Sequence, residues 1–155
     1  MQTERYTTRD RAYSAWHRAS STRRFVGIER ASLLSMIDLD AALYVEYDDR
    51  AREPLALIET ARDVGQLHKT ATITASLARR ARLPAYTLLY QTAKIHNPAD
   101  TRYPDIIGFR VRRIWPQPET GWRTLTPQAW AEALLSIREW AATRLDAEAA
   151  NDPQW

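Results

Sequence analysis

The sequence predicts an α/β fold, a single-domain sandwich around a mixed central sheet with an additional C-terminal helix. Apolar runs rich in β-branched and aromatic residues, bounded by turn residues, predict the strands. Between two of these runs, apolar residues recur at three- and four-residue spacing over residues 63–82, which predicts a crossover helix. A strongly amphipathic segment over residues 126–145 predicts the last helix. Strands that alternate with helices in this way are typical of layered α/β domains.

The length and composition of the chain fit one globular domain. It has 155 residues, of which 45% are hydrophobic and 26% are charged. We expect the domain to cover residues 1–147 and residues 148–155 to form a flexible tail. No apolar run approaches the length of a membrane span, and the N-terminal residues lack the apolar centre of a signal peptide, so we expect a cytoplasmic protein without membrane contacts. The absence of cysteine excludes disulfides and thiolate zinc sites.

The first half of the chain is expected to begin with a helix and continue with strands. The Thr7-Thr8-Arg9-Asp10 segment is typical of a helix start, and the helix is expected to run to about Ser20. Residues 25–35 are ambiguous, with a short strand and a turn as our interpretation. Residues 36–47 then predict a long strand, and Pro54 marks the start of the next strand.

After Glu59 the pattern changes from strand to helix. Val64 and Leu67 begin the helical spacing, and Pro84 ends it. The apolar run 85–90 predicts a strand that is buried on both faces.

The last part of the chain contains a loop, a strand and a helix. We expect the loop over residues 92–104 and the strand over residues 108–114. Thr126 and Pro127 are suited to the N-cap and first turn of the final helix. The expected order is therefore helix, two or three strands, helix, strand, strand, helix.

Carboxylates stand on the two apolar strands that precede the crossover helix. They are Asp38, Asp40 and Glu59. A carboxylate among apolar residues is costly unless it is paired, neutralised or bound to a metal. Because the ligands are hard oxygens, Mg²⁺ or Mn²⁺ is the expected ion. The sequence thus predicts a divalent-metal site made by these three acids, and the alternative is that they face solvent on half-exposed strands.

The distribution of charge says more than the net charge of +3. Residues 36–63 are mostly acidic, whereas the segments before and after them are basic. This arrangement is suited to an enzyme that binds metal cations through its acidic segment and a polyanion through its basic segments. The alternative is that the charged runs are solvent-exposed faces without a ligand. The arginines that we expect to contact nucleic-acid phosphates are Arg23, Arg24, Arg62, Arg110 and Arg112.

Two short motifs carry a resemblance to a known family. Ile37-Asp38-Leu39-Asp40 on one strand and Leu57-Ile58-Glu59-Thr60-Ala61 before the helix resemble the PD-(D/E)XK, or restriction-endonuclease-like, nuclease superfamily over roughly residues 9–114. The chain is also similar to small prophage and bacterial proteins through these motifs and the continuation to Gln66. The resemblance implies an αβββαβ-like core and a metal-dependent nuclease that acts on DNA phosphodiester bonds.

The chain departs from this family at Ala61, where the family has a lysine. Either the fold no longer cuts and instead binds DNA or a protein partner, or the cation has moved elsewhere. Lys69 is the candidate for a moved cation, because lysine approaches a metal-bound water as a compact charge. Gln66, three residues earlier, would share its helix face and hold the same water or a phosphate.

In the active interpretation the catalytic group is Asp40, Glu59, Lys69 and Gln66. The alternative for Lys69 is an ordinary surface position.

We expect DNA as a partner, and a homodimer is a further alternative that the sequence does not exclude.

Overall fold

The computed structural model describes residue 16, residues 19–34 and residues 39–150. The chain divides into two compact units, Met1–Asp38 and Leu39–Trp155. In the first unit, α2 (Ala19–Val26) is followed by the short α3 (Ile28–Ala31). Gly27 separates them with a φ of 85°, a backbone conformation that favours glycine. Most of this segment is therefore helical, so the short strand that we considered for residues 25–35 is wrong, whereas a turn is present at Ser32 and Leu33. Most of the helix expected up to Ser20 lies outside the described residues.

The second unit is built on a five-stranded mixed sheet in which the strands lie side by side in chain order. Only β2 and β3 are parallel among the described strands, and α4 connects them. The α/β class, the mixed sheet and the additional C-terminal helix are confirmed. The elements are β1 (Ala41–Glu46), β2 (Arg52–Arg62), α4 (Thr72–Ala81), β3 (Ala85–Asn97), β4 (Asp100–Trp115), β5 (Arg123–Leu125) and α5 (Pro127–Ala150).

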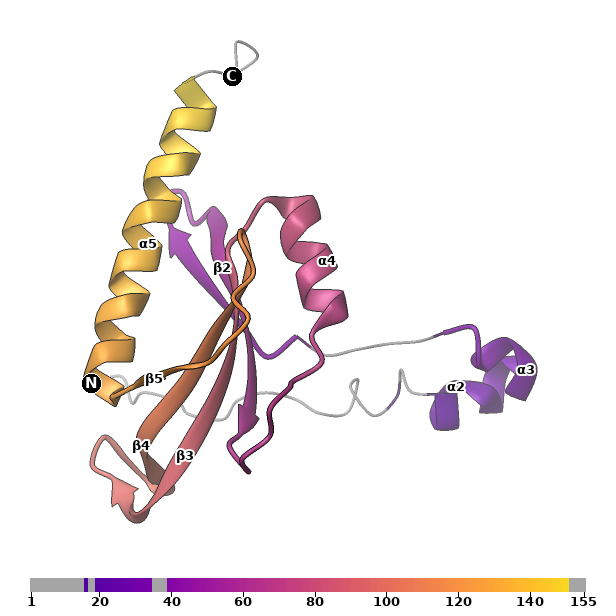
Figure 1. Cartoon of the computed structure of the whole chain (residues 1–155). Helices are drawn as coiled ribbons and strands as arrows, with labels where there is room; N and C mark the ends of the chain where they lie inside the picture. Colours follow the sequence, from indigo (N-terminus) through magenta and orange to yellow (C-terminus); the bar gives the residue numbers. More distant parts are fainter. Residues whose placement is uncertain (1–15, 17–18, 35–38, 151–155) are drawn as a thin grey trace, which may run out of the picture. The chain divides into compact units, whose positions relative to one another are not determined.

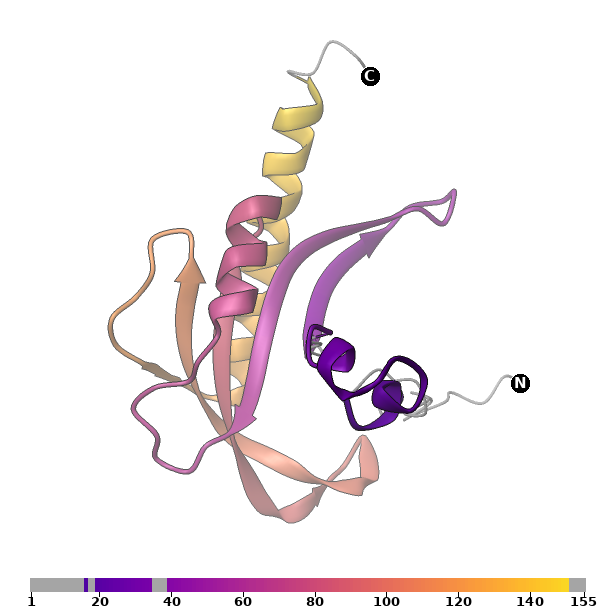
Figure 2. The ribbon, with the colours of Figure 1, turned by 90° about the vertical axis from the view of Figure 1, so that its right-hand side faces the viewer.

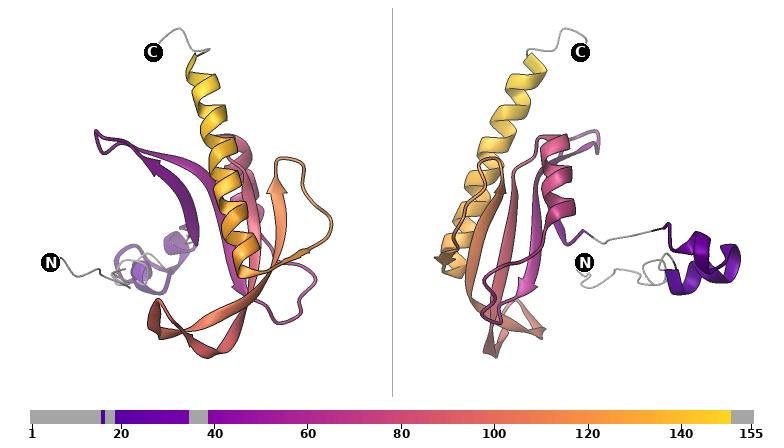
Figure 3. Two further views of the ribbon diagram at one scale, coloured as in Figure 1. Left: turned by 90° about the vertical axis from the view of Figure 1, so that its left-hand side faces the viewer. Right: turned by 45° about the vertical axis from the view of Figure 1, so that its right-hand side comes forward.

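The two long helices of this unit cover opposite faces of the sheet (Figures 1 and 3). On one face, Trp130 and Ile137 of α5 pack in the larger core with alternate residues of the strands. The Trp130 ring meets Tyr86 edge-on, with the ring centroids 6.3 Å apart. On the other face, Ala78 of α4 packs against the smaller apolar cluster that contains Leu57 and Ala85. Because side chains alternate along a strand, successive residues of β2 and β3 contribute to different faces.

The β3–β4 pair is much longer than the sequence predicted. Residues 92–104 form paired strands with a tight turn, so the loop that we expected there is wrong. At the turn, the Asn97 side chain accepts a hydrogen bond from the backbone N–H of Ala99. The strands continue beyond their neighbours as a two-stranded arm (Figure 2), in which cross-strand pairing satisfies the backbone.

The crossover helix starts later than its apolar spacing predicted. β2 continues to Arg62, residues 63–71 form a loop, and α4 begins at Thr72. Val64 and Leu67, which we placed on the inner face of a helix, are 77% and 74% exposed. Gly65 has a φ of 83°, which breaks helical geometry at this point. Lys69 and Gln66 therefore lie in a loop, and their placement on a helix is wrong.

The final helix begins where the sequence predicted. Thr126 Oγ1 accepts a hydrogen bond of 3.1 Å from the backbone N–H of Ala129, which is the expected N-cap contact. The helix continues to Ala150 and so includes the first three residues of the tail that we expected. Among the described residues, no helix is long and apolar enough to cross a membrane.

Candidate phosphate-binding site

Two adjacent rows of residues across the α4 face of the sheet contain charged side chains. In the first row, the strand register places Thr87 of β3 between Glu59 of β2 and Arg112 of β4. In the next row, Leu89 lies between Ala61 and Arg110. A charged residue in each row is unusual for a face that is covered by a helix, so each one requires a partner.

Glu59 is buried, with 7% of its surface exposed, and its partner comes from α4. The hydroxyl of Thr74, which is 2% exposed, donates a hydrogen bond of 2.5 Å to Glu59 Oε1. One hydrogen bond between these side chains thus joins β2 to the helix that covers it.

Asp40 lies just before β1 and contacts the residue that follows Glu59. Its Oδ2 atom accepts a 2.8 Å hydrogen bond from the Thr60 backbone N–H and lies 3.4 Å from Thr60 Oγ1. The carboxylate thereby extends the β1–β2 pairing by one step. Asp38 lies outside the described residues. Within the described part of the chain, no three or more His, Asp or Glu side chains gather as a metal-binding group.

Asp63, at the end of β2, is paired with Arg110 of β4 through two hydrogen bonds. Arg110 Nε donates to Oδ2 at 2.8 Å, and its Nη2 atom donates to Oδ1 at 2.7 Å. Gln91 and the backbone N–H of Gly65 donate to the same carboxylate. These donors, Arg110 first, hold the pKa of Asp63 well below its ordinary value, and the Asp63 carboxylate raises the pKa of Arg110.

The same arginine fastens the loop over residues 63–71. Arg110 Nη2 also donates to the backbone oxygen of Gln66 at 2.9 Å. The Gln66 side chain donates to the Arg62 carbonyl at 3.0 Å and accepts from the Val64 N–H at 2.8 Å. Asp63 and Gln66 thus satisfy backbone groups locally, which competes with helix formation and explains why this segment is a loop.

Trp122 connects this loop to the opposite edge of the site. Its indole Nε1–H donates a 2.8 Å hydrogen bond to the Leu67 carbonyl. Arg110 and Arg112 lie over its ring, with guanidinium carbons 5.3 and 5.9 Å from the ring centroid. Arg110 and Trp122 therefore hold the adjacent carbonyls of Gln66 and Leu67, just before His68 and Lys69.

A cavity of about 270 Å³ lies beside this loop, and we call it the basic cavity. It is bounded by the loop, the start of α4, the middle of the sheet and the segment after β4. Its lining residues are His68, Lys69, Ala71, Thr72, Ala75, Thr87, Arg112, Arg113, Ile114, Pro118, Glu119 and Trp122.

Two of the predicted functional cations, Lys69 and Arg112, meet at the basic cavity. Lys69 is half-buried and forms no hydrogen bond or ion pair with the described residues. Arg112 donates through Nε to the Glu119 carbonyl at 2.6 Å, and its terminal amino groups have no hydrogen-bond partner in the described part. Two cations that share a concave site without pairing to carboxylates favour an anion.

Neutral donors border the same cavity. Thr87 is 3% exposed, and its hydroxyl has no hydrogen-bond partner among the described residues. The first turn of α4 lies next to it, and Ala71 provides no side-chain cap for that turn. A helix start leaves free N–H groups and a partial positive charge, so it favours the same kind of ligand.

The acidic residue among the lining side chains, Glu119, is already paired. Its Oε1 atom accepts from the Arg113 backbone N–H at 2.9 Å and from Arg123 Nη2 at 3.0 Å. It therefore holds the wall of the basic cavity together and does not neutralise Lys69.

The other predicted phosphate contacts lie elsewhere. Arg62 is exposed at the end of β2, 3.3 Å from Thr92 Oγ1. Arg23 and Arg24 are exposed on α2 in the first unit, where Arg24 lies over the Phe25 ring. Arg110 is occupied by Asp63, so its charge serves the loop.

Sequence reasoning missed three residues of this site. They are Asp63, Thr87 and Trp122. The sequence predicted Asp63 near the start of the crossover helix, and its contact with Arg110 depends on the register of β2, β3 and β4. Trp122 lies in the segment after Pro118, and no local sequence pattern predicts its hydrogen bond with the Leu67 carbonyl.

Comparison of the chain with protein-family models, curated proteins and solved structures found no match. The resemblance to nucleases therefore stays a prediction based on the motifs.

Proposed function

We propose that this protein binds DNA, with a backbone phosphate held in the basic cavity. The observation that carries the proposal is the convergence of Lys69 and Arg112 on one concave site where neither cation pairs with a carboxylate of the described residues. Uncompensated cations at half-buried positions are costly unless a ligand supplies the opposite charge.

The donors around the cavity suit a phosphate group. A phosphate presents several acceptor oxygens, and the site offers an ammonium, a guanidinium, the Thr87 hydroxyl and the N–H groups of the α4 start. The cavity has a volume of about 270 Å³. We place one backbone phosphate in it and the rest of the nucleic acid outside it.

The remainder of the chain favours a polyanion over a free phosphate ion. The sequence pI is about 9.4, and Arg79 and Arg80 are exposed in the last turn of α4. Non-specific phosphate contacts from such residues raise the affinity for nucleic acid without reading its sequence.

Fluorescence anisotropy with labelled single-stranded and duplex DNA at low salt tests this proposal. Lys69→Gln and Arg112→Gln should each weaken binding about tenfold, since each removes a charge-assisted contact. Lys94→Gln is the matched control, because Lys94 is the other lysine and is exposed on the β3–β4 arm. Equal affinities for all four proteins, or no DNA binding at low salt, would contradict the proposal. Binding of inorganic phosphate alone would indicate a small anion as the ligand.

Metal-dependent cleavage of DNA is a second candidate function. Asp40 bonds the residue next to Glu59, and Glu59 is the strand partner of Thr87, which lines the cavity with Lys69. Two carboxylates suit Mg²⁺ or Mn²⁺, which usually keep several waters. A bound ion would supply an activated water for phosphodiester hydrolysis.

Incubation with Mg²⁺ or Mn²⁺ and linear, circular, single-stranded and branched DNA tests this candidate. Cleavage that is lost in Asp40→Asn, Glu59→Gln and Lys69→Ala would support it. Calorimetry with the metal alone gives a separate readout, because the two carboxylate variants should then bind the ion more weakly. DNA binding without cleavage or metal binding would leave the interpretation of a nuclease-like fold that binds without cutting.

A further inference from the structure

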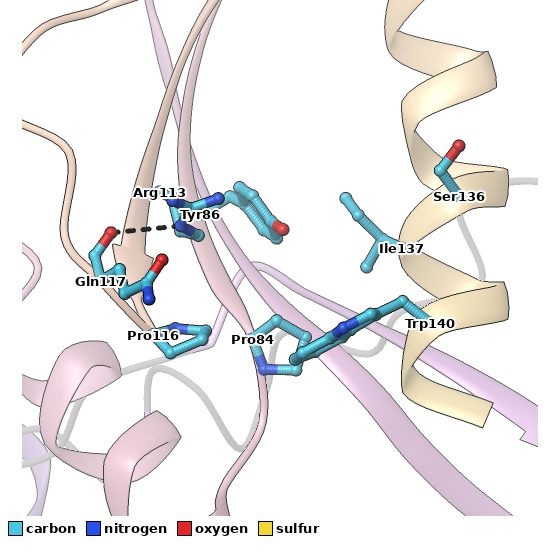
Figure 4. A pocket seen from close by; sticks show the side chains of 8 residues that line it. All are labelled: Pro84, Tyr86, Arg113, Pro116, Gln117, Ser136, Ile137 and Trp140. Atoms are coloured by element: carbon cyan, nitrogen blue, oxygen red, sulfur yellow. Dashed lines mark hydrogen bonds between the residues drawn. The ribbon is translucent and has the colours of Figure 1, made fainter. Parts of the chain in front are cut away.

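A second cavity, of about 350 Å³, lies on the opposite face of the sheet under α5 (Figure 4). We call it the α5 cavity. Its size falls in the range of small-molecule sites. It is lined by Pro84, Tyr86, Arg113, Pro116, Gln117, Ser136, Ile137 and Trp140.

The walls of the α5 cavity are flat and apolar. Pro84 and Ile137 are buried, whereas Trp140 is 45% exposed and its ring lies beside Pro84 (Figure 4). Pro116, which follows the end of β4, also lines this cavity. Proline and tryptophan surfaces of this kind pack well against a planar aromatic ring.

The polar groups of the α5 cavity include one cation and no carboxylate. Arg113 donates through Nε to the Gln117 carbonyl at 3.2 Å. Its terminal amino groups make no hydrogen bond or ion pair with the described residues. When the Nε atom of an arginine is fixed in this way, its two terminal amino groups form a planar fork that matches the two oxygens of a carboxylate.

Tyr86 adds a hydroxyl to this end of the α5 cavity. Its side chain is 9% exposed, and its hydroxyl points into the space between the sheet and Ile137 (Figure 4). Burial raises the pKa of Tyr86, while the nearby Arg113 lowers it. The phenol is therefore held protonated and can donate a hydrogen bond to an anion.

We propose that the α5 cavity binds a small aromatic carboxylate. The ring of the ligand lies against Pro84, Ile137 and Trp140, and its carboxylate pairs with Arg113 and accepts a hydrogen bond from Tyr86. A carboxylate fits better than a phosphate ester, because this site offers a single cation and mostly apolar walls. Arg113 lines both cavities, but Lys69, Thr87 and Arg112 do not line the α5 cavity, so this inference does not depend on a phosphate held by those residues.

Calorimetry with 2-naphthoate and its neutral counterpart, naphthalene-2-carboxamide, tests the assignment. The carboxylate should bind with a Kd of about 1 mM or tighter, as expected for a ligand of this size. The amide should bind at least about tenfold more weakly, because it lacks the charge that pairs with Arg113. This comparison uses the unaltered protein, so a folding defect in a variant cannot affect it.

Two variants and one control locate the binding. Arg113→Gln should weaken 2-naphthoate about tenfold and leave the amide almost unchanged. Trp140→Ala should weaken both probes, because it removes the ring surface. Arg138→Gln is the control, since Arg138 is exposed on the same helix and does not line the α5 cavity. Equal affinities of the wild type for the acid and the amide would overturn the proposal, and so would an unchanged affinity of Arg113→Gln for 2-naphthoate. The absence of any binding of 2-naphthoate at concentrations several times higher than about 1 mM would also overturn it.

Discussion

The Asp63 carboxylate and the Arg110 guanidinium form a two-point ion pair across the sheet, from the end of β2 to β4. Asp63 and Arg110 have side-chain exposures of 5% and 19%, so water screens the pair less than it would a surface pair. Arg110 also donates to the Gln66 carbonyl, so it joins β4 to the loop that carries Lys69.

Arg110→Gln should raise the pKa of Asp63 toward its ordinary value of 3.8. The folded-state pKa is lowered, so the pair stabilises the protein above about pH 4 and this contribution is lost as the pH falls further. The difference in Tm between the variant and the wild type should therefore be larger at pH 7 than at pH 3. An NMR titration of the carboxyl carbons checks the pKa, and Asp100, whose pKa Arg102 lowers, serves as the internal control. An unchanged Asp63 titration would contradict this role for Arg110.

Trp122→Ala should loosen residues 63–71 and cost about 2 kcal/mol, because it removes a hydrogen bond and two cation–aromatic contacts. Trp122→Phe keeps a ring under the arginines and loses the indole donor, so its effect should be smaller. Hydrogen exchange of the loop amides measures both. If exchange in this loop is the same in the wild type and Trp122→Ala, the indole does not hold the loop.

The fold class could be predicted because strand and helix patterns are local. Thr126 and Pro127 mark the start of α5 through local backbone chemistry, and the structure has the helix there. The start of α4 could not be predicted in this way. The apolar spacing of Val64 and Leu67 looked helical, but the local hydrogen bonds of Asp63 and the positive φ of Gly65 favour a loop.

The candidate site was predictable in its chemistry and less so in its geometry. Lys69 and Arg112 were identified by residue type, and the fold brings them to one cavity. Arg110 was identified with them, but its charge is taken by Asp63, because the β2–β3–β4 register brings the two together. Register depends on contacts that are distant in sequence, so no local pattern could separate the roles of Arg110 and Arg112.

Glu59→Ala should destabilise the protein by about 1–3 kcal/mol, because the buried Thr74 hydroxyl loses its acceptor. Glu59→Gln should cost less, since its amide oxygen can still accept that hydrogen bond. Urea unfolding of both variants, of Thr74→Val and of the double variant Glu59→Ala/Thr74→Val gives the coupling between the two residues. A coupling near zero would mean that the two side chains contribute independently.

Ala61→Lys tests the proposed relation to nucleases at the position where the family lysine is missing. Ala61 lies on the α4 face, two residues after Glu59 on the same side of β2. If the protein is inactive for want of this cation, the variant should gain metal-dependent cleavage. If Lys69 replaces the cation, the wild type should cut, Lys69→Ala should not, and Ala61→Lys should restore part of the loss. Normal cleavage by Lys69→Ala would remove Lys69 from the reaction.

The salt dependence of DNA affinity tests the basic cavity most directly. A phosphate contact releases counterions, so the slope of log K against log salt should be smaller in magnitude by about 0.9 in Lys69→Gln than in the wild type. Lys94→Gln should keep the slope of the wild type. Identical slopes for the wild type and Lys69→Gln would contradict the claim that Lys69 holds a backbone phosphate.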